Sequence, residues 1–391
     1  MDRDKVVVVH SFPLWLPQTQ TWMYQQLRHL PNEADVHVVC DRTKNLDQFF
    51  VENIHCLRDT SFPLFVWEKS LRRSFLPQYR NHLASIAGRI RAHIVHSHFG
   101  PIGWVDMRAA RQAGSRHIVS FYGYDVGMLP ASDRRWLTRY NALFSQANLF
   151  LCEGPHMAEQ LNALGCPREK IRIHHLGVDV QTISFAPRTW RKGEPLRVLI
   201  AASFREKKGI PYALEALAQL QTESSLEITI IGDADIERRS HEEKARIVDI
   251  ISKRGIASMT RLMGYQPHAR VMEEAYRHHI FISPSVTASD GDTEGGAPVS
   301  LIEMMATGMP VISTKHCDIP EVVQYGIQTW LVEERDVAKL VERIRWLLDH
   351  TSEWGTLLRT GRTHIEKEYD AVRQGGRLLD IYRELQHGIT S

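Results

Sequence analysis

The segment HIFISPSVTASDGDTEGGAPVSLIEMMATGMPVIST, residues 279–314, has the pattern of a strand, a glycine-rich loop, a helix and a second strand. Its first and last runs, His279–Ser283 and Pro310–Thr314, are largely apolar without alternation, as strands covered on both faces are. Pro298 suits the first turn of the helix, and Gly308 suits its end. Two strands joined through a helix are the unit of a parallel sheet, so the segment predicts an α/β fold.

The same alternation of strand-like and helical patterns continues on both sides of this segment. Short apolar runs recur at Lys5–His10, Asp35–Cys40, His93–Ser97, His117–Phe121, Asn148–Cys152, Ile171–His175, Arg197–Ala202, Leu226–Gly232 and Thr329–Val332. A polar run with a proline near each end, Ala186–Pro195, predicts a linker. We therefore expect two Rossmann-like, doubly wound parallel-sheet domains, residues 1–187 and 188–369, with 370–391 forming a helix that returns to the first domain. Ligands of such sheets bind at the carboxyl ends of the strands, so we expect the domains to face a central cleft.

Composition and charge exclude several classes of protein. The chain has 391 residues, of which 43% are hydrophobic, and its net charge of +2 is too weak to indicate nucleic-acid binding. Its five cysteines include no CxxC pair, which argues against a zinc site or a disulfide framework and favours buried, reduced thiols. No apolar run reaches the ~18 residues of a membrane span, and MDRDKVVVVHSF lacks the pattern of a signal peptide, so we expect a cytoplasmic protein.

A basic loop follows the strand-like run RVLIAAS. Arg205, Lys207 and Lys208 lie between the end of that strand and the helical pattern IPYALEALAQL. Cations beside the amide groups of a helix start suit a diphosphate. The alternative is a solvated, lysine-rich turn without a ligand.

The glycine-rich loop is the second candidate site. Gly295 and Gly296 allow the backbone to approach a ligand closely or to adopt a positive φ. Glu294 at the loop tip can meet sugar hydroxyls, and Glu303 in the following helix can accept both hydroxyls of a ribose. The alternative makes Glu294 a charge at a helix N-terminus and Glu303 a solvent-facing residue.

Two clusters raise the question of a metal site. Asp290 and Asp292 have the spacing of the Asp-x-Asp pair of metal-dependent transferases, but the basic loop already supplies positive charge, and Asp and Gly favour turns. His93, His96 and His98 lie on one predicted strand, where only His96 and His98 share a face, so a buried strand is the simpler interpretation. We therefore expect no metal site.

Two segments of the first half are candidates for the acceptor side and the membrane. Ser11–Trp22 lacks the glycines of a phosphate cradle and precedes a helix that begins near Thr19 or Thr21, so we interpret it as an acceptor-side loop. Ser61–Arg80 mixes aromatic with basic residues, which is typical of a membrane-surface helix. The favoured alternative for this second segment is an ordinary amphipathic helix that packs on the sheet.

Nearly the whole chain resembles glycosyltransferase family 4, the retaining nucleotide-sugar transferases with the GT-B fold. The resemblance rests on several motifs taken together: EKKG (206–209), IGDAD (231–235), GYQPHARVMEEAYRHHIFISPS (264–285), EGGAPVSLIEMMATGMPVIST (294–314) and DIPEVV (318–323), with HFG (98–100), YGYD (122–125) and LGVD (176–179) in the first half. It implies a glycosyltransferase that uses a UDP- or GDP-sugar, without cofactor or metal. It also implies a glycan or lipid-linked acceptor of cell-surface or exopolysaccharide biosynthesis, which allows peripheral contact with the inner membrane surface.

The positions that match the family motifs imply a role for each residue. Lys208 would hold the donor phosphates with Arg205 beside it, Glu303 the ribose and Glu294 the transferring sugar. The remaining donor-site positions are Ser203, Tyr265, Gln266, Gly295, Gly296, Ala297 and Pro298, of which Tyr265 and Gln266 would flank the nucleobase. The first domain would add Tyr122 to the catalytic set, and the acceptor-side positions are His98, Tyr124 and Asp125.

This chain departs from the family pattern at three points. Eight residues, Gly295–Ile302, separate the two glutamates, where the family usually has seven. Ser203 stands where the family has a phosphate-binding arginine, and Arg205 is the substitute that we predict. Tyr122 replaces the usual histidine, and a phenol with a pKa of ~10 can form hydrogen bonds but is a poor base at neutral pH.

The expected mechanism stabilises the departing diphosphate and an oxocarbenium-like sugar through Lys208, Arg205 and the amides of the glycine-rich loop, without a protein nucleophile. The leaving diphosphate can take the acceptor's proton on the same face of the sugar. Two alternatives stay open: a sugar-nucleotide epimerase or hydrolase of the same fold, and a non-catalytic nucleotide-sugar-binding protein.

Overall fold

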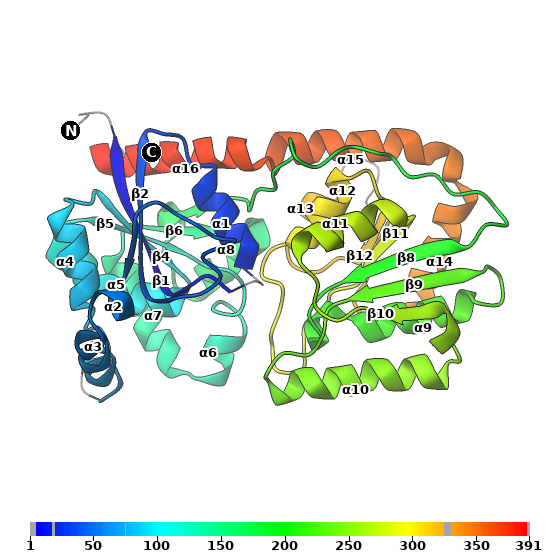
Figure 1. Cartoon of the computed structure of the whole chain (residues 1–391), viewed down its shortest axis with the longest axis horizontal. Helices are drawn as coiled ribbons and strands as arrows, with labels where there is room; N and C mark the ends of the chain where they lie inside the picture. The colour runs from blue at the N-terminus through cyan, green and yellow to red at the C-terminus, as the bar shows by residue number, and fades with distance from the viewer. Residues whose placement is uncertain (1–4, 18–19, 75, 324–329, 389–391) are drawn as a thin grey trace. The chain divides into compact units, whose positions relative to one another are not determined.

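The computed structural model describes residues 5–17, 20–74, 76–323 and 330–388, which fall into two compact α/β units (Figure 1). Unit 1 comprises Met1–Asp179 and Asp370–Ser391, and unit 2 comprises Val180–Tyr369. Each unit is built around one sheet in which the described strands pair in parallel. The predicted α/β class with two Rossmann-like sheets is confirmed.

The sheet of unit 1 has seven strands in the order β3-β2-β1-β4-β5-β6-β7. Its strands are β1 (Val6–Trp15), β2 (Ala34–Thr43), β3 (Ile54–Cys56), β4 (Ile94–His98), β5 (Arg116–Ser120), β6 (Leu149–Cys152) and β7 (Ile171–Ile173). Its helices are α1 (Thr21–Arg28), α2 (Leu57–Thr60), α3 (Phe62–Ser74), α4 (Asn81–Arg89), α5 (Gly100–Ala113), α6 (Met128–Ser132), α7 (Arg135–Gln146), α8 (Pro155–Ala163) and α16 (Ala371–His387). The strand order reverses between β1 and β4, which makes the sheet doubly wound.

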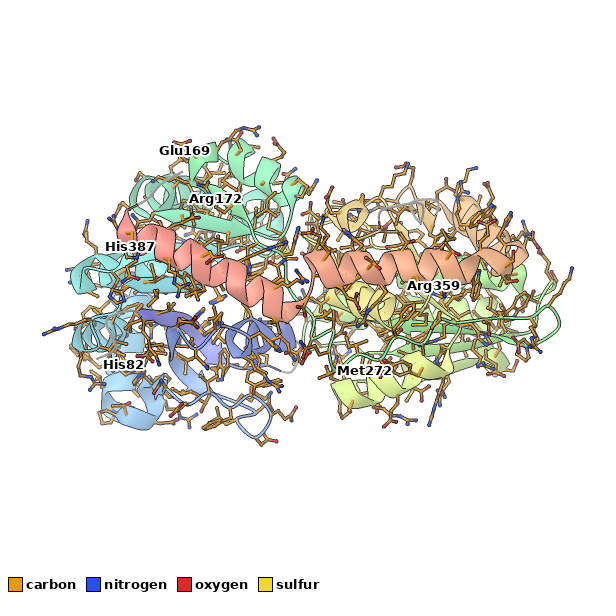
Figure 2. The ribbon with its side chains drawn as sticks, turned by 90° about the horizontal axis from the view of Figure 1, so that it is seen from above. His82, Glu169, Arg172, Met272, Arg359 and His387 are labelled. Atoms are coloured by element: carbon orange, nitrogen blue, oxygen red, sulfur yellow. The ribbon has the colours of Figure 1, made fainter. Side chains whose placement is uncertain are left out.

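The valines of β1 alternate between two cores on opposite faces of this sheet. Val6 and Val8 pack against the apolar side of α16, and Val7 and Val9 pack against α4 and α5. Figure 2 shows α16, with His387 near its end, lying across unit 1. Because helices cover both faces, β1 is apolar at every position from Val6 to Val9 rather than at alternate ones.

The sheet of unit 2 has six strands in the order β10-β9-β8-β11-β12-β13. Its strands are β8 (Leu196–Ala201), β9 (Leu226–Ile231), β10 (Thr260–Leu262), β11 (Ile280–Ser283), β12 (Val311–Thr314) and β13 (Leu331–Val332). Its helices are α9 (Ile210–Leu220), α10 (Arg238–Lys253), α11 (His268–Arg277), α12 (Val299–Ala306), α13 (Ile319–Val322), α14 (Val337–Asp349) and α15 (Trp354–Glu368). The order again reverses at a neighbouring pair, β8 and β11, whose carboxyl ends carry the loops singled out in the sequence.

The boundary between the units lies at 179/180, so the predicted boundary at 187/188 is corrected. The reason is that the intervening backbone finds its hydrogen-bond partners in unit 2. The Ala186 N–H donates to the Thr307 carbonyl at 2.9 Å, and Arg362 donates to the Val180 carbonyl at 2.8 Å. The predicted linker, Ala186–Pro195, is therefore a segment of unit 2 without helix or strand, and segment 370–391 belongs to unit 1.

The prediction that Ser11–Trp22 is a loop is wrong for its first five residues, because β1 continues to Trp15. Ser11 pairs with Val39 in β2, and the Trp15 side chain is buried, so burial and pairing extend the strand past the apolar run. Of the two predicted helix starts, Thr21 is the first residue of α1, and Thr19 lies outside the described residues. Thr329, the first residue of the predicted strand Thr329–Val332, also lies outside the described residues. The short strands β3 and β10 were not predicted.

The cysteines agree with the sequence prediction of reduced thiols. All five are free, with Cys40, Cys56, Cys152 and Cys166 buried and Cys317 partly buried.

Candidate functional site

The predicted phosphate loop connects β8 to α9 in unit 2. Residues 206–208 form one 3₁₀ turn, and Gly209 adopts a left-handed conformation with φ of 63° from which α9 begins. A Cβ atom at Gly209 would lie 1.9 Å from the carbonyl oxygen of Pro284, just after β11. Only glycine permits this approach, which places Lys208 beside the glycine-rich loop.

The Lys208 ammonium group forms two contacts with the Glu294 carboxylate, at 2.9 and 2.7 Å. Ser285 also donates to this carboxylate at 2.8 Å, and the Glu294 N–H donates to His316 Nε2 at 3.1 Å. Burial by itself would raise the pKa of Glu294, but the ammonium groups of Lys208 and Lys207 outweigh burial and lower that pKa to about 2. Glu294 is therefore an ionised, buried acceptor, and it faces Lys208 instead of standing at a loop tip.

The two other cations of the basic loop are also paired. Lys207 contacts Asp292 at 3.1 Å, from the same segment as Glu294. The Arg205 guanidinium contacts Asp235 at 3.0 Å and Glu237 at 2.8 Å, beyond the end of β9. Each cation of the basic loop is thus paired with a carboxylate, and a bound diphosphate would have to replace these carboxylates as the partner of the cations.

The glycine-rich loop has the backbone that its sequence predicts. Gly295 has φ of 80°, and Gly295 and Gly296 are buried. Ala297 is half-buried, and Pro298 immediately precedes α12. The loop enters α12 from its N-terminal side, where backbone N–H groups lack partners within the helix.

Glu303 lies one turn into α12 and meets a residue that the sequence analysis did not single out. His268, at the start of α11, places its Nε2 2.7 Å from the Glu303 carboxylate. The hydrogen bond to Glu303 raises the pKa of His268 above its ordinary value, against the effect of burial. The predicted ribose acid is therefore already hydrogen-bonded to a histidine whose pKa is raised.

The remaining predicted donor residues lie around these loops. Tyr265 is exposed and close enough to Asp235 and Asp233 for their charges to raise its pKa, although burial contributes most. The Gln266 amide donates to the Met263 carbonyl at 2.6 Å. Ser203 is half-buried and lies two residues after the end of β8.

The acidic pair Asp290 and Asp292 forms turn and salt-bridge contacts. The Asp292 N–H donates to Asp290 at 3.0 Å, and Asp290 contacts Arg239. Since Asp292 also binds Lys207, both carboxylates already face cationic side chains.

In unit 1 the structure brings together Tyr122, His98 and Asp125. The Tyr122 hydroxyl lies 2.6 Å from His98 Nδ1, and the Tyr122 N–H donates to Asp125 at 3.0 Å. Asp125 also accepts from the Gly100 N–H at 2.8 Å, and burial raises its pKa to about 6. Asp125 and His98 are fully buried, so Tyr124, at 39% exposed, and the half-buried Tyr122 are the groups of this set at the surface of unit 1.

Comparison with known proteins agrees with this arrangement. Residues 19–182 match the family model described as Glycosyltransferase Family 4, and residues 183–358 match the model described as Glycosyl transferases group 1. The colanic acid biosynthesis glycosyltransferase WcaL of Escherichia coli (strain K12) is 32% identical over 299 residues, which are 74% of this chain and 70% of WcaL. The chain belongs to glycosyltransferase family 4.

Other relatives and structures support the assignment. The glycosyltransferase is 30% identical to the amylovoran biosynthesis glycosyltransferase AmsK of Erwinia amylovora over 289 residues, 72% of this chain and 69% of AmsK. Its structure matches that of Anabaena HepE in complex with UDP and glucose with a TM-score of 0.75 and 14% identity, covering 97% of this chain and 100% of HepE. Sucrose-phosphate synthase from Thermosynechococcus elongatus matches with a TM-score of 0.76 and 18% identity, covering 98% and 100% of the two chains. These structural matches show the GT-B fold.

Two residues at the basic and glycine-rich loops of the glycosyltransferase were not predicted from the sequence. His316 lies two residues after the end of β12 and contacts both Glu294 and Glu334, at 3.1 and 2.6 Å. Its place after a parallel strand was a usable signal. No sequence pattern indicated the contact of His268 with Glu303, because that contact depends on how α11 and α12 are positioned in the fold.

Proposed function

We propose that this glycosyltransferase moves a sugar, with retention and without a metal ion, from a UDP- or GDP-linked donor to a glycan or lipid-linked acceptor in exopolysaccharide assembly. The pathway class is supported by the names of WcaL and AmsK, which refer to colanic acid and amylovoran biosynthesis. A nucleotide-sugar donor is supported by the structures of HepE with UDP and with UDP-glucose. The observation that carries the proposal is the pair Lys208–Glu294 at the carboxyl ends of β8 and β11.

The pair suits a donor because its two members prefer different parts of a nucleotide sugar. A diphosphate carries more charge than a carboxylate, so it competes for the Lys208 ammonium group. Glu294 would keep its hydrogen bond from Ser285 and its neighbour Lys207, and a carboxylate only accepts hydrogen bonds, which sugar hydroxyls donate. Donor binding would therefore exchange one ion pair for a phosphate contact and a sugar contact.

The same cations act on the leaving group in the proposed reaction. As the bond from the sugar to the diphosphate breaks, negative charge grows on the phosphate and positive charge on the sugar. Lys208 and the amides around Gly295 and Gly296 would stabilise the first charge, and Glu294 would stabilise the second. The acceptor oxygen bonds to the anomeric carbon on the face that the phosphate leaves and gives its proton to that phosphate, which retains the configuration.

The ribose end of the proposed site is the carboxylate of Glu303. It lies 2.7 Å from His268 Nε2 and its side chain is 14% exposed, so it can accept hydrogen bonds from the ribose hydroxyls if His268 gives up or shares this contact. Tyr265, whose exposed ring lies near Asp235 and Arg205, would offer an aromatic surface for the base.

Contact with the membrane surface at the cytoplasmic face is part of the proposal for the acceptor. Helix α3 exposes Phe62, Val66 and Trp67, at 58%, 49% and 59%. Two of its basic residues, Lys69 and Arg72, contact Asp41 instead of being free for lipid headgroups. Phe75 lies outside the described residues. Of the helices in the described ranges, none is long and apolar enough to cross a membrane.

Two assays test these assignments. Released nucleotide is measured with UDP-glucose, UDP-galactose, GDP-mannose and GDP-fucose, with and without a lipid extract, and NMR identifies the anomeric configuration of the product. Acceptor-dependent release that survives EDTA, with retention, is the expected result. Release that needs no acceptor, or inversion, contradicts the proposal.

The membrane contact is tested by flotation of the protein with phosphatidylglycerol vesicles. The fraction of protein that floats should be lower for Trp67→Ser, and an unchanged fraction contradicts the membrane contact.

A further inference from the structure

Six buried or half-buried side chains of unit 1 form one hydrogen-bonded series, which we call the histidine chain: Tyr122, His98, His10, Tyr382, His96 and Ser120. They come from β1, β4, the end of β5, the loop after it and α16. Parallel pairing sets His10 opposite His96 and His98 opposite Ser120, so the sheet register brings the polar groups together. None of them forms an ion pair among the described residues.

The distances define the order of the histidine chain. His98 Nδ1 lies 2.6 Å from the Tyr122 hydroxyl, and His98 Nε2 lies 3.0 Å from His10 Nδ1. His10 Nε2 lies 3.5 Å from the Tyr382 hydroxyl, which lies 2.7 Å from His96 Nδ1. His96 Nε2 lies 2.7 Å from Ser120 Oγ, and the Ser120 side chain in turn interacts with Tyr122, so a substrate would use the remaining lone pair of the phenol oxygen.

The three imidazoles are neutral, which limits each to one N–H. Burial lowers the pKa of His10 to about 3 and lowers the pKa values of His96 and His98 well below the usual 6.5. A neutral imidazole donates through one nitrogen and accepts through the other, so fixing one hydrogen bond fixes its neighbours.

Two contacts select the direction. The Tyr382 hydroxyl lies 2.7 Å from His96 Nδ1 and the Tyr122 hydroxyl lies 2.6 Å from His98 Nδ1, distances that are typical of an O–H donor and short for an N–H donor, so each phenol donates to its histidine. His10 must then carry its proton on Nε2 and accept at Nδ1 from His98 Nε2–H. His98 Nδ1 is left bare and takes the proton of the Tyr122 hydroxyl.

We propose that Tyr122 presents an oxygen lone pair, not its proton, to a sugar hydroxyl of the substrate, and that His98 is the positioning residue that fixes this polarity. The inference rests on the proposed function for the identity of the substrate. Trp22 and Phe99 flank the phenol, with ring centroids 4.4 and 4.9 Å from that of Tyr122. An aromatic surround with one oriented polar atom suits the apolar faces and hydroxyls of a sugar.

The same histidines are also close enough together to be considered as metal ligands. Ligand atoms of His10, His96 and His98 lie within 4.8 Å of one another. Each ring nitrogen of the three nevertheless faces a partner in the histidine chain at 2.6–3.5 Å, so a metal ion would have to displace these contacts.

Imidazole ¹⁵N NMR tests the polarity without substrate. In the full-length protein labelled with ¹⁵N-histidine, His10, His96 and His98 should each be neutral and protonated on Nε2 from pH 6 to 8. Signals are assigned with His10→Gln, His96→Gln and His98→Asn. A His98 protonated on Nδ1, or an imidazolium, overturns the inference whatever the enzyme's substrate is.

Kinetics with UDP-glucose or GDP-mannose, whichever supports turnover, tests the role in the enzyme. Tyr122→Phe should lower kcat/KM roughly tenfold, the scale for one lost hydrogen bond. His98→Leu should match it, His98→Asn should retain most activity because its amide oxygen can accept the phenol proton, and the Tyr122→Phe/His98→Leu double variant should lose nothing further. Additive losses mean that His98 acts only structurally and overturn its positioning role. A rise in the KM of the donor or of the acceptor identifies which sugar is bound, and Tyr276→Phe is the control.

Discussion

The histidine chain of unit 1 and the basic and glycine-rich loops of unit 2 both bury polar side chains, but the histidines are neutral and the carboxylate of unit 2 is charged. Both collect polar side chains at the carboxyl ends of parallel strands. In unit 1 burial drives the pKa of His98 down, and the group becomes neutral. In unit 2 burial opposes ionisation of Glu294, but Lys208 and Lys207 reverse the outcome and the carboxylate stays charged.

The difference teaches that burial alone does not decide the charge of a polar site. What decides it is whether an opposite charge comes with the buried group, since desolvation penalises a lone ion far more than a paired one. A series of neutral histidines can set the direction of a hydrogen bond. A group of ion pairs can instead exchange one of its partners for a charged ligand. The first arrangement suits orientation, and the second suits electrostatic stabilisation.

The largest expected effect comes from removing the central cation of unit 2. Lys208→Ala should lower kcat by roughly 10²–10³, the scale for losing one preorganised electrostatic donor. Steady-state kinetics with the identified donor measures it. Lys253→Ala, an exposed lysine paired with Asp249, is the matched control. Normal turnover in Lys208→Ala would defeat the assignment of this loop as the phosphate site.

Glu303→Gln should raise the KM of the donor roughly ten- to a hundredfold, because hydrogen bonds to a charged acceptor are worth more than those to an amide. The KM of UDP-glucose is compared with the inhibition constant of UDP, or the KM of GDP-mannose with the inhibition constant of GDP. An equal rise in both constants shows that the lost contact was to the nucleotide. Glu342→Gln, an exposed glutamate on α14, is the control. An unchanged KM for the nucleotide removes Glu303 from the ribose site.

Gly209→Ala tests how tightly the basic loop is pressed against the end of β11. The new methyl group would meet the Pro284 oxygen at 1.9 Å, so we expect unfolding to become easier by about 1–3 kcal/mol. Gly255→Ala is the matched control, because its φ of 69° is similar but nothing lies within 4 Å of the new atom. Chemical denaturation compares the two, and equal losses would mean that the close approach contributes nothing.

The smallest effect concerns the pair of His268 with Glu303. Because folding raises the pKa of His268 above 6.5, its contribution to stability is fully present below pH 6.5 and is lost as pH rises through the folded pKa. His268→Gln should therefore lower Tm more at pH 5.5 than at pH 8.5. The side chain is 48% exposed, so solvent screening keeps the change small. The exposed His241→Gln is the comparison, and a difference independent of pH argues against the pair.

Much of the fold can be predicted from the sequence, because the pattern that specifies each strand is local. Runs such as Arg197–Ala202 are apolar on both faces, and only a strand between two helix layers uses that pattern. The loops after β8 and β11 could also be located, since glycine and proline fix the turns that follow each strand. Short strands such as β3 and β10 carry too few apolar residues to be recognised in this way.

The sites were predictable only in part. Lys208, Glu294 and Glu303 were singled out by their place in the motifs, and their roles stay predictions. The partners of these residues were not predicted: Asp235 for Arg205, His268 for Glu303 and His316 for Glu294. Each pair joins elements far apart in the chain, so its formation depends on packing that no local pattern encodes.

By itself the sequence determined two parallel α/β units, the loops at the strand ends and membership of a glycosyltransferase family. It did so because strand burial, turn chemistry and motif spacing are local properties of the chain. Only the tertiary structure decided which charges meet, that His10 and Tyr382 join His96 and His98, and where the second unit begins. Those outcomes depend on the register of strands and the docking of helices, which bring together residues as much as 372 positions apart.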